Sequence, residues 1–406
     1  MTTLSADDLV SRQYEALPYP ARNPRDETRR LIEGSPGALP EMRHWIFGGR
    51  LPARMRVLFA GGGTGDGCIM LAQQLADAGI AAEITHLDMS AAAQKIAAER
   101  AAIRGLKVDF VRGSLLDVER LAPGPFDYID CCGVLHHLAD PAAGLAALRS
   151  VLARGGGMGL MVYGRIGRSG VYDMQDALRL LAPEGDPPAA RLAIAKRLLP
   201  ALPTTNRLRR NEAVTDHLNG GDAGIFDLLL HSRDRAYDVE SFVGLIEDGG
   251  LGLASLIEPA RYQPETYLLD PQLRRIAGDL DPRDRAVLAE RLAGNIARHV
   301  AYVVHPDHEA LPPAPLDPDA IPVWSRTDGA QMAAAMGSDR VLKLTLDGLA
   351  YRFPLPQSAP VIARAIDGRA SVGEIAAQVK VQGFERAWPA TFAVLNGISR
   401  LFLRRA

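Results

Sequence analysis

Short apolar segments alternate with helical segments between residues 56 and 163, and this alternation constrains the fold more than any other feature of the sequence. The expected strands are RVLFA (56–60), EITHLD (83–88), VDFVRG (108–113), FDYIDCCG (126–133) and GMGLMVYG (157–164). The expected helices between them are CIMLAQQLADAG (68–79), SAAAQKIAAERAAIRG (90–105) and DPAAGLAALRSVLARGG (140–156). Alternating strands and helices indicate βαβ units. We therefore expect an α/β fold, a Rossmann-like, doubly wound, mostly parallel sheet with helices on both faces.

The remaining segments predict additions to this sheet. Residues 1–50 are rich in turns and prolines, and we expect an N-terminal leader or lid there. Residues 51–305 are expected to form the ligand-binding sheet domain, with a helical insertion at about 165–235 where the alternation stops. A proline-rich linker (306–322) then leads to a small C-terminal α+β domain (323–406). That domain is expected to hold a hairpin and helices ending with PATFAVLNGISRLFL (389–403), and it faintly resembles small winged-helix modules.

Composition excludes several functional classes. The net charge is −2 and the charged fraction is 23%, which argues against a nucleic-acid or membrane surface. No apolar run reaches membrane-spanning length and no secretory signal is visible, so we expect a cytoplasmic protein. The three cysteines have no CxxC spacing. We therefore expect neither a disulfide framework nor a metal site. A homodimer remains open.

The segment VLFAGGGTGDG (57–67) joins a strand to a helix through five glycines. Such a turn lets the main chain approach a ligand closely. No lysine follows as a phosphate-binding P-loop requires, and Asp66 stands where the dinucleotide fingerprint needs its third glycine. Gly61, Gly63 and Gly65 remain, in a spacing that suits a loop around a smaller ligand. Asp88 lies 23 residues after Gly65 at a strand end, where a carboxylate can accept ribose hydroxyls or merely cap a helix.

These residues resemble the class I S-adenosylmethionine-dependent methyltransferases, including bacterial members with a PYP-type leader such as QYEALPYPARNP (13–24). The matching segments are VLFAGGGTGDG, HLDMS (86–90), FVRGSLLD (110–117), FDYIDCCGVLHHLADP (126–141) and ARGGGMGLMVYG (153–164). The resemblance implies S-adenosyl-L-methionine as the cofactor. It implies that the following residues bind it: Gly61, Gly63 and Gly65 near the methionine part, Asp88 on the ribose, Met89, Ser114 and Leu115 around the adenine, and Cys132, Gly133 and Val134 in the methyl-donor pocket.

Three positions depart from the family pattern. Phe59 stands where the family usually has an acid, two residues before the first glycine, and Ser114 stands where an acid usually contacts adenine. Gly62 replaces a frequent cysteine, a change of little expected consequence. We expect a working cofactor site, with adenine binding resting on Leu115 and packing.

Candidate acceptor-site residues lie beside the predicted cofactor site. His137, in the segment VLHHLADP, is expected as a base or acceptor-orienting group because the histidine pKa is near neutral. Its neighbour His136 should point to another side, so the two are no ready metal pair. Tyr163 ends the fifth strand at the same edge. Tyr14 and Tyr19 of the leader either close over the cofactor or anchor the leader, and Cys131 and Cys132 are expected as buried packing.

The resemblance implies an enzyme, a methyltransferase that transfers a methyl group by direct displacement to an unidentified O, N or C nucleophile. The acceptor is a small molecule, or a protein or peptide held by the C-terminal module through strand addition. The alternative is a regulatory protein that binds the cofactor without turnover. A nicotinamide-dependent oxidoreductase is disfavoured because the dinucleotide fingerprint fails.

Overall fold

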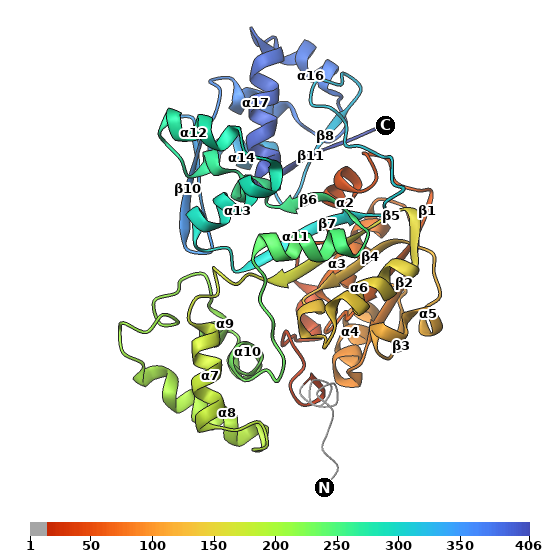
Figure 1. The fold of residues 1–406 in the computed structure, drawn as a ribbon. Coiled ribbons are helices and arrows are strands. Elements are labelled where there is room, and N and C mark those ends of the chain that lie inside the picture. The colour runs from red at the N-terminus through yellow and green to blue at the C-terminus, as the bar shows by residue number, and fades with distance from the viewer. Residues whose placement is uncertain (1–13) are drawn as a thin grey trace.

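A seven-stranded sheet lies at the centre of the computed structural model, which describes residues 14–406 (Figure 1). Its spatial order is β3-β2-β1-β4-β5-β7-β6. The strands are β1 (Arg54–Ala60), β2 (Ala81–Asp88), β3 (Asp109–Arg112), β4 (Phe126–Cys132), β5 (Leu152–Tyr163), β6 (Gly252–Ile257) and β7 (Arg298–Val304). β7 runs antiparallel to both of its neighbours, and β1 to β5 pair in parallel. The predicted doubly wound, mostly parallel sheet is confirmed.

Helices cover both faces of the sheet because successive side chains of each strand point to opposite sides. In β1, Val57 and Phe59 face an apolar cluster with α2 (Leu39–Trp45) and α3 (Asp66–Asp77). Leu58 and Ala60 belong to a second cluster. The second cluster is completed by α5 (Val118–Leu121), α6 (Pro141–Ser150), α11 (Val239–Asp248) and α13 (Pro282–Ala293). α4 (Ala91–Ile103) packs beside α3.

The expected insertion is helical and follows β5 directly. It contains α7 (Val171–Leu181), α8 (Pro188–Leu198), α9 (Asp216–Asn219) and α10 (Gly221–Leu229). Its apolar side chains form their own cluster, which includes Met174, Phe226 and Leu229 and touches Leu17 of the leader. The insertion therefore has a packed interior of its own beside the sheet (Figure 1).

The C-terminal part carries two small antiparallel sheets and four helices. Its strands are β8 (Ile321–Trp324), β9 (Val341–Leu346), β10 (Leu349–Pro354) and β11 (Leu401–Arg404), paired as β9–β10 and β8–β11. Outside this part, α12 (Pro271–Gly278) precedes α13. The helices of the C-terminal part are α14 (Gly329–Ala335), α15 (Ala359–Ala365), α16 (Val372–Val379) and α17 (Phe384–Gly397). These elements share one apolar cluster around the fully buried Trp388. The proposed domain boundaries stay a prediction.

Three expected element boundaries are wrong. The helix before β5 ends at Ser150 instead of reaching the glycines at 155 and 156, and the strand begins at Leu152. The linker ends earlier, because Ile321 and Pro322 pair with β11. The final helix ends at Gly397, and Leu401–Arg404 form a strand. In each case strand pairing with a distant segment overrides the local helical or linker character.

The leader connects the parts of the molecule, although residues 1–13 of the predicted leader lie outside the described residues. It contains the short 3₁₀ helix η1 (Pro24–Thr28) and α2. Buried His44 of α2 accepts a hydrogen bond from the Leu403 amide of β11 at 3.2 Å. Buried Glu41 forms an ion pair with Arg326 at 3.0 Å and accepts the Tyr302 hydroxyl at 3.1 Å. The leader thus joins the C-terminal part to the central sheet.

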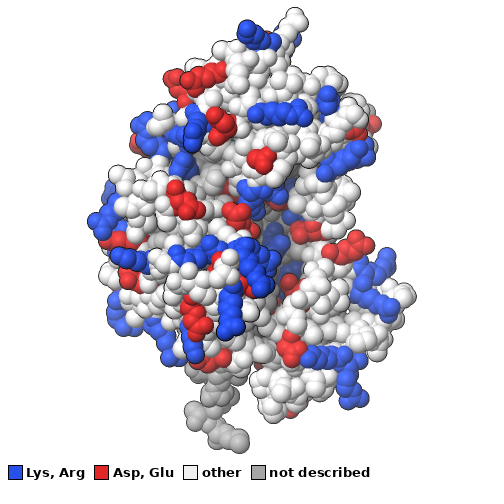
Figure 2. All heavy atoms as spheres, turned by 180° about the vertical axis from the view of Figure 1, so that it is seen from behind, with Lys and Arg blue, Asp and Glu red and all other residues white. Residues whose placement is uncertain are grey.

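The surface bears both charge signs. Figure 2 shows Lys and Arg side chains interspersed with Asp and Glu on the face opposite to that of Figure 1. Among residues 14–406, no helix combines the length and the apolar character needed to cross a bilayer.

Candidate functional site: a glycine loop and a buried histidine–tyrosine cluster

The glycine loop lies between the end of β1 and the start of α3, as the sequence predicts. Gly61, Gly63 and Gly65 have φ angles of +75°, +53° and +95°, which favour glycine. A Cβ atom on Gly61 would lie 2.4 Å from Val134 Cγ2, and one on Gly65 would lie 2.9 Å from Ala97. These two glycines are thus required by the packing of the protein itself. At Gly63 a Cβ atom would meet only the Tyr19 carbonyl oxygen, at 3.2 Å, so the main chain of the leader lies directly against this glycine.

Asp88 holds the loop in place from the end of β2. Its Oδ2 accepts the Gly63 amide at 2.7 Å, and its Oδ1 accepts the Ser90 amide at 2.8 Å. His86 adds a third contact, because its Nε2 lies 3.1 Å from the Gly63 carbonyl oxygen. The Asp88 carboxylate is half-buried, and each of its oxygens can accept a second hydrogen bond. It therefore combines a structural role in the loop with free acceptor capacity.

The predicted donor-pocket residues follow β4 at the same edge of the sheet. Cys132 is exposed, which corrects its expected burial, whereas Cys131 is buried in the core as expected. Gly133 and Val134 are half-buried. On the predicted adenine side, Met89 is half-buried, and Ser114 caps a short 3₁₀ helix, η2 (Leu115–Asp117), by accepting the Leu116 amide at 3.2 Å. The Leu115 side chain lies in the core, so its main chain alone faces this edge.

S-adenosylmethionine fits this set of residues. A bare main chain at Gly63, a carboxylate with spare acceptor capacity at Asp88 and an exposed strand end at Cys132 lie along the carboxyl edge of the parallel strands, where open α/β sheets bind ligands. The sulfonium cofactor would supply both the methyl group and its leaving group when bound.

The leader lies across the glycine loop. Thr64 donates its hydroxyl to the Pro20 carbonyl at 2.8 Å, and Arg22 forms an ion pair with Asp66 at 2.6 Å. Arg100 of α4, which is 1% exposed, binds both Asp66 and Glu27 of the leader at 2.7 Å. Buried ion pairs of this kind fix the position of the segments that they join. The leader therefore forms one wall of the candidate cofactor site.

A second polar group, which we call the histidine–tyrosine cluster, lies where the ends of β4 and β5 meet the insertion. It comprises Tyr14, His136, His137, Tyr163, Asp227 and His231. His137 and His231 stack with ring centroids 3.9 Å apart, and the His136 ring lies 4.1 Å from both His137 and Tyr163. The two adjacent histidines thus share one cluster, because the short 3₁₀ helix η3 (Leu135–His137) turns both rings inward. The expectation that they point apart is wrong.

Asp227 is the centre of the hydrogen bonds in this cluster. Tyr14 donates its hydroxyl to Oδ1 and Tyr163 donates its hydroxyl to Oδ2, each at 3.0 Å. Tyr14 also lies 3.3 Å from Nε2 of His231. A leader tyrosine and a strand-end tyrosine therefore both bind one carboxyl group of α10.

Burial controls the ionisation of the cluster. It raises the pKa of Asp227, although the two tyrosine hydroxyls oppose that effect. Burial raises the pKa values of Tyr14 and Tyr163 well above their usual range, and the nearby Asp227 raises them further. Burial lowers the pKa values of His136 and His231 well below the usual histidine range. Both rings are therefore neutral at pH 7.

A buried acid lies beside the position where the family acid is missing. Phe59 pairs with Asp130 of β4 across the parallel ladder, and Asp130 is 5% exposed. Its Oδ2 accepts the Tyr128 hydroxyl at 3.1 Å. Burial raises the pKa of Asp130 to about 7, against the opposing effect of that hydroxyl. Residue 59 is therefore not an acid, but a carboxyl group lies beside it on the next strand.

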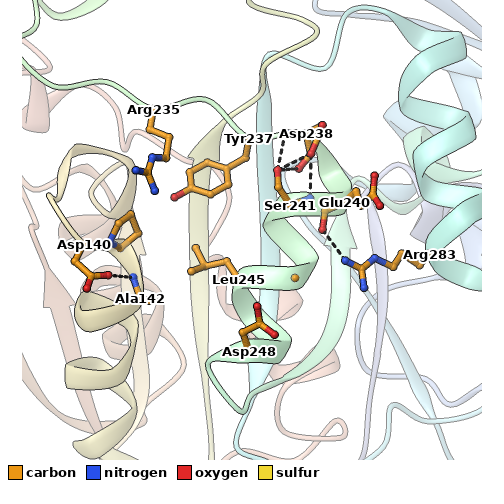
Figure 3. A pocket seen from close by; sticks show the side chains of 12 residues that line it. Asp140, Ala142, Arg235, Tyr237, Asp238, Glu240, Ser241, Leu245, Asp248 and Arg283 are labelled. Carbon is orange, nitrogen blue, oxygen red and sulfur yellow. Dashed lines mark hydrogen bonds between the residues drawn. The ribbon is translucent and has the colours of Figure 1, made fainter.

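A surface cleft of about 630 Å³ opens between the start of α6 and α11 (Figure 3). Its walls include Asp140, Arg235, Tyr237, Glu240 and Arg283. None of the predicted cofactor or acceptor residues lines it. We therefore assign it no role in the site.

Sequence comparison identifies the type of domain. Residues 58–158, which hold the glycine loop, Asp88 and the β4 motif, match the family model of a methyltransferase domain. Together with the strand order, this match confirms a class I S-adenosylmethionine-dependent methyltransferase domain. An uncharacterized protein of Synechococcus sp. is 37% identical over 273 residues, 64% of this chain and 62% of that protein. A ubiquinone biosynthesis O-methyltransferase of Thiobacillus denitrificans is 30% identical over 156 residues, 38% of this chain and 62% of that enzyme. The chain thus spans less than two thirds of these relatives.

Comparison of structures supports the same fold. The structure of PKMT2 from Rickettsia typhi matches 98% of this chain and 74% of its own, with a TM-score of 0.60 and 15% identity. Its complex with AdoHcy matches 90% of this chain and 75% of its own, with a TM-score of 0.61 and 14% identity. At this identity the likeness concerns the fold.

The sequence alone did not identify several residues of the site. Asp227 and His231 lie in the insertion, in the otherwise apolar segment GIFDLLLHS (224–232), and Asp130 lies in the apolar strand FDYIDCC (126–132). Isolated polar residues inside apolar segments are a signal of buried, paired groups. That signal could have identified these three residues, although it could not have brought them together.

Proposed function

We propose that the chain transfers a methyl group from S-adenosyl-L-methionine to an unidentified O, N or C nucleophile. One observation carries this proposal. The Gly63 amide, on a main chain without a side chain, donates to Asp88 at 2.7 Å within a segment that matches a methyltransferase domain. Methyl transfer is a direct displacement, so the protein chiefly aligns the nucleophile, methyl carbon and sulfur and excludes water.

The cofactor contacts are assigned to the carboxyl edge of β1, β2 and β4. Gly61, Gly63 and Gly65 face the methionine part, and Asp88 accepts the ribose hydroxyls. Met89, Ser114 and the Leu115 main chain lie toward the adenine, and Cys132, Gly133 and Val134 line the methyl-donor pocket. The leader segment that binds Thr64 and Asp66 helps to exclude water, because it covers the loop from outside.

The acceptor is assigned to the histidine–tyrosine cluster, with His137 and Tyr163 as the residues that orient it. His137 Nδ1 lies 2.8 Å from the Arg233 carbonyl oxygen and therefore donates to it, which leaves a lone pair on Nε2. Such a ring can accept a proton from a bound nucleophile. The relative named for O-methyl transfer favours an oxygen nucleophile among the three kinds, either on a small molecule or on a protein or peptide held by the C-terminal part.

The alternative is a regulatory protein that binds the cofactor without turnover. Phe59 at the usual position of an acid would favour this alternative. The buried carboxyl group of Asp130 on the neighbouring strand argues against it, because an acid is still present beside position 59. The match to O-methyltransferases also disfavours it. The cytoplasmic location and a homodimer stay predictions.

The proposal is tested first by cofactor binding. Isothermal titration of the wild type should detect S-adenosylmethionine and its demethylated product but no NAD. Gly63→Val should abolish binding, because the side chain would press on the Tyr19 carbonyl oxygen, occupy space proposed for the cofactor and strain a backbone with φ of +53°. Gly79→Val is the matched control, since its φ is +67° and a Cβ atom there meets nothing within 4 Å. A folded Gly63→Val variant that binds as the wild type does would contradict the assignment.

Turnover is tested separately. The protein is added to a lysate with S-adenosylmethionine labelled at the methyl group, and the small-molecule and protein fractions are counted. Uptake of label in either fraction, lost in Gly63→Val, supports transfer. Cofactor binding without uptake in any fraction favours the regulatory alternative.

A further inference from the structure

Three side chains that can bind a metal, those of His136, His137 and Asp234, place their ligand atoms within 4.8 Å of one another. The first two belong to the histidine–tyrosine cluster, and buried atoms of His136 and Asp234 lack hydrogen-bond partners among the described residues. Asp234 reaches this place from the segment that follows α10, whose Arg235 amide donates to the His136 carbonyl at 3.1 Å. Buried polar groups normally have partners, so several unpaired atoms at one point indicate a missing ligand.

His136 is the least satisfied of the three. It is 0% exposed, and among the described residues neither Nδ1 nor Nε2 has a hydrogen-bond partner. An imidazole in this setting loses its hydrogen bonds to water without replacement, which is unfavourable. A metal ion would satisfy one of these nitrogens.

Asp234 is oriented like a carboxylate that binds a metal. Its side chain is 0% exposed, and Oδ2 accepts hydrogen bonds from Arg168 and Gln175, each at 3.1 Å. Within the described part of the chain, its Oδ1 is buried and has no partner. Outer hydrogen bonds of this kind fix a ligand group while leaving its other atom free.

His137 completes the set. The hydrogen bond from its Nδ1 to the Arg233 carbonyl fixes the tautomer that carries a lone pair on Nε2. A backbone carbonyl is a usual outer partner of a histidine that binds a metal. Two neutral imidazoles and one carboxylate are the ligands that zinc and related divalent transition ions prefer.

A second group, formed by His137, Asp227 and His231, also places its ligand atoms within 4.8 Å of one another. Its atoms, however, already take part in other hydrogen bonds. Both oxygens of Asp227 already accept tyrosine hydroxyls. Nδ1 of His231 accepts the Arg233 amide at 3.0 Å, so its Nε2 carries the proton. A metal ion at this second group would have to displace the proton on Nε2 of His231 or the amide bonded to its Nδ1.

We propose that His136, His137 and Asp234 bind a divalent first-row transition ion of the zinc type. The ion would lie beside Tyr163, at the place assigned to the acceptor. While the ion is bound, Nε2 of His137 is a metal ligand and is not available to accept a proton. The expectation of no metal site depended on the absence of a CxxC spacing and on the two adjacent histidines pointing apart, whereas the two rings lie 4.1 Å from each other. The proposal stands apart from methyl transfer, because metal binding is measured without cofactor or acceptor.

The test uses Co²⁺ as a probe, whose visible d–d absorption reports coordination by protein ligands. The full-length chain, free of any affinity tag and treated with a chelator, should bind one Co²⁺ per chain, and Zn²⁺ should displace it. His136→Gln and Asp234→Asn should weaken Co²⁺ binding by about tenfold or more. His231→Gln should bind as the wild type does. Metal addition should also raise the melting temperature of the wild type but not of Asp234→Asn.

Two results would overturn the proposal. One is the absence of saturable Co²⁺ absorption in the wild type. The other is binding that persists in Asp234→Asn and disappears in His231→Gln, which would place the ion at the second group. If His136→Gln fails to fold, Asp234→Asn alone decides the question, since it preserves the shape of the side chain.

Discussion

Replacing Asp88 by Asn separates the two roles that this carboxylate can have. Asp88 accepts the amides of Gly63 and Ser90 in the free protein, and we propose that it also accepts ribose hydroxyls in the complex. Asn preserves the shape but offers a single acceptor oxygen. One of the two amides then faces an NH₂ group, so the free energy of unfolding should fall by about 1.5–3 kcal/mol.

Cofactor affinity reports the second role alone. The loop bonds are lost equally in the free and the bound folded protein, and they cancel from the binding free energy. If Asp88 also holds the ribose, loss of that acceptor should weaken S-adenosylmethionine binding by about 1.5–3 kcal/mol, which is about 10- to 150-fold in Kd. Isothermal titration and urea denaturation on the same samples measure the two effects.

The matched control is Asp77→Asn, which makes the same charge change at an exposed residue of α3 that bonds only to Gln73. It should change neither quantity by more than about 0.5 kcal/mol. An Asp88→Asn variant that loses stability but binds the cofactor with unchanged affinity would reduce Asp88 to a loop tie and refute the ribose assignment.

Three further predictions concern the buried polar groups. Tyr163→Phe removes one of the two hydroxyls bound to Asp227 and should lower the free energy of unfolding by about 1–3 kcal/mol. Cofactor affinity in titrations should stay unchanged, and a large change would place Tyr163 at the cofactor. Arg100→Met removes the ion pairs of Arg100 with Glu27 and Asp66 and leaves buried Glu27 with Arg104, so it should cost at most about 3–5 kcal/mol in urea denaturation, whereas a cost below about 1 kcal/mol would show dispensable ion pairs. Because burial raises the pKa of Asp130 to about 7, the folded protein binds more protons than the unfolded chain between about pH 4 and pH 7, and stability should fall as the pH rises through this range. Asp130→Asn should remove this fall, which amounts to at most about 4 kcal/mol. The same pH profile in both proteins would exclude Asp130 as its cause.

The sheet domain could be predicted because its signals are local. The glycine spacing at 61–65 specifies a strand–turn–helix junction, and apolar segments of strand length flanked by turns specify the parallel strands. The segments Leu152–Gly156 and Leu401–Arg404 were misread for the opposite reason. Their pairing partners, β4 and β8, lie elsewhere in the sequence, and local propensity does not report them.

The histidine–tyrosine cluster shows the same limit at the level of the site. Tyr163 was found because it ends a predicted strand, and His137 because it follows one at the same edge of the sheet. Asp227 and His231 come from the insertion, and Tyr14 comes from the leader. No spacing in the sequence connects these segments, so their convergence depends on how the insertion packs against the sheet.

The position of α2 has a practical consequence for work on fragments. Glu41 and His44 contact Arg326 and Leu403 on one side, and Tyr302 of the sheet contacts Glu41 on the other. Removing the C-terminal part at the linker would leave buried Glu41 without its cationic partner and His44 without its main-chain partner, in an opened apolar interface. A methyltransferase fragment prepared by such a cut should therefore be less soluble and less stable than its match to isolated domains suggests, and both pieces are best produced together.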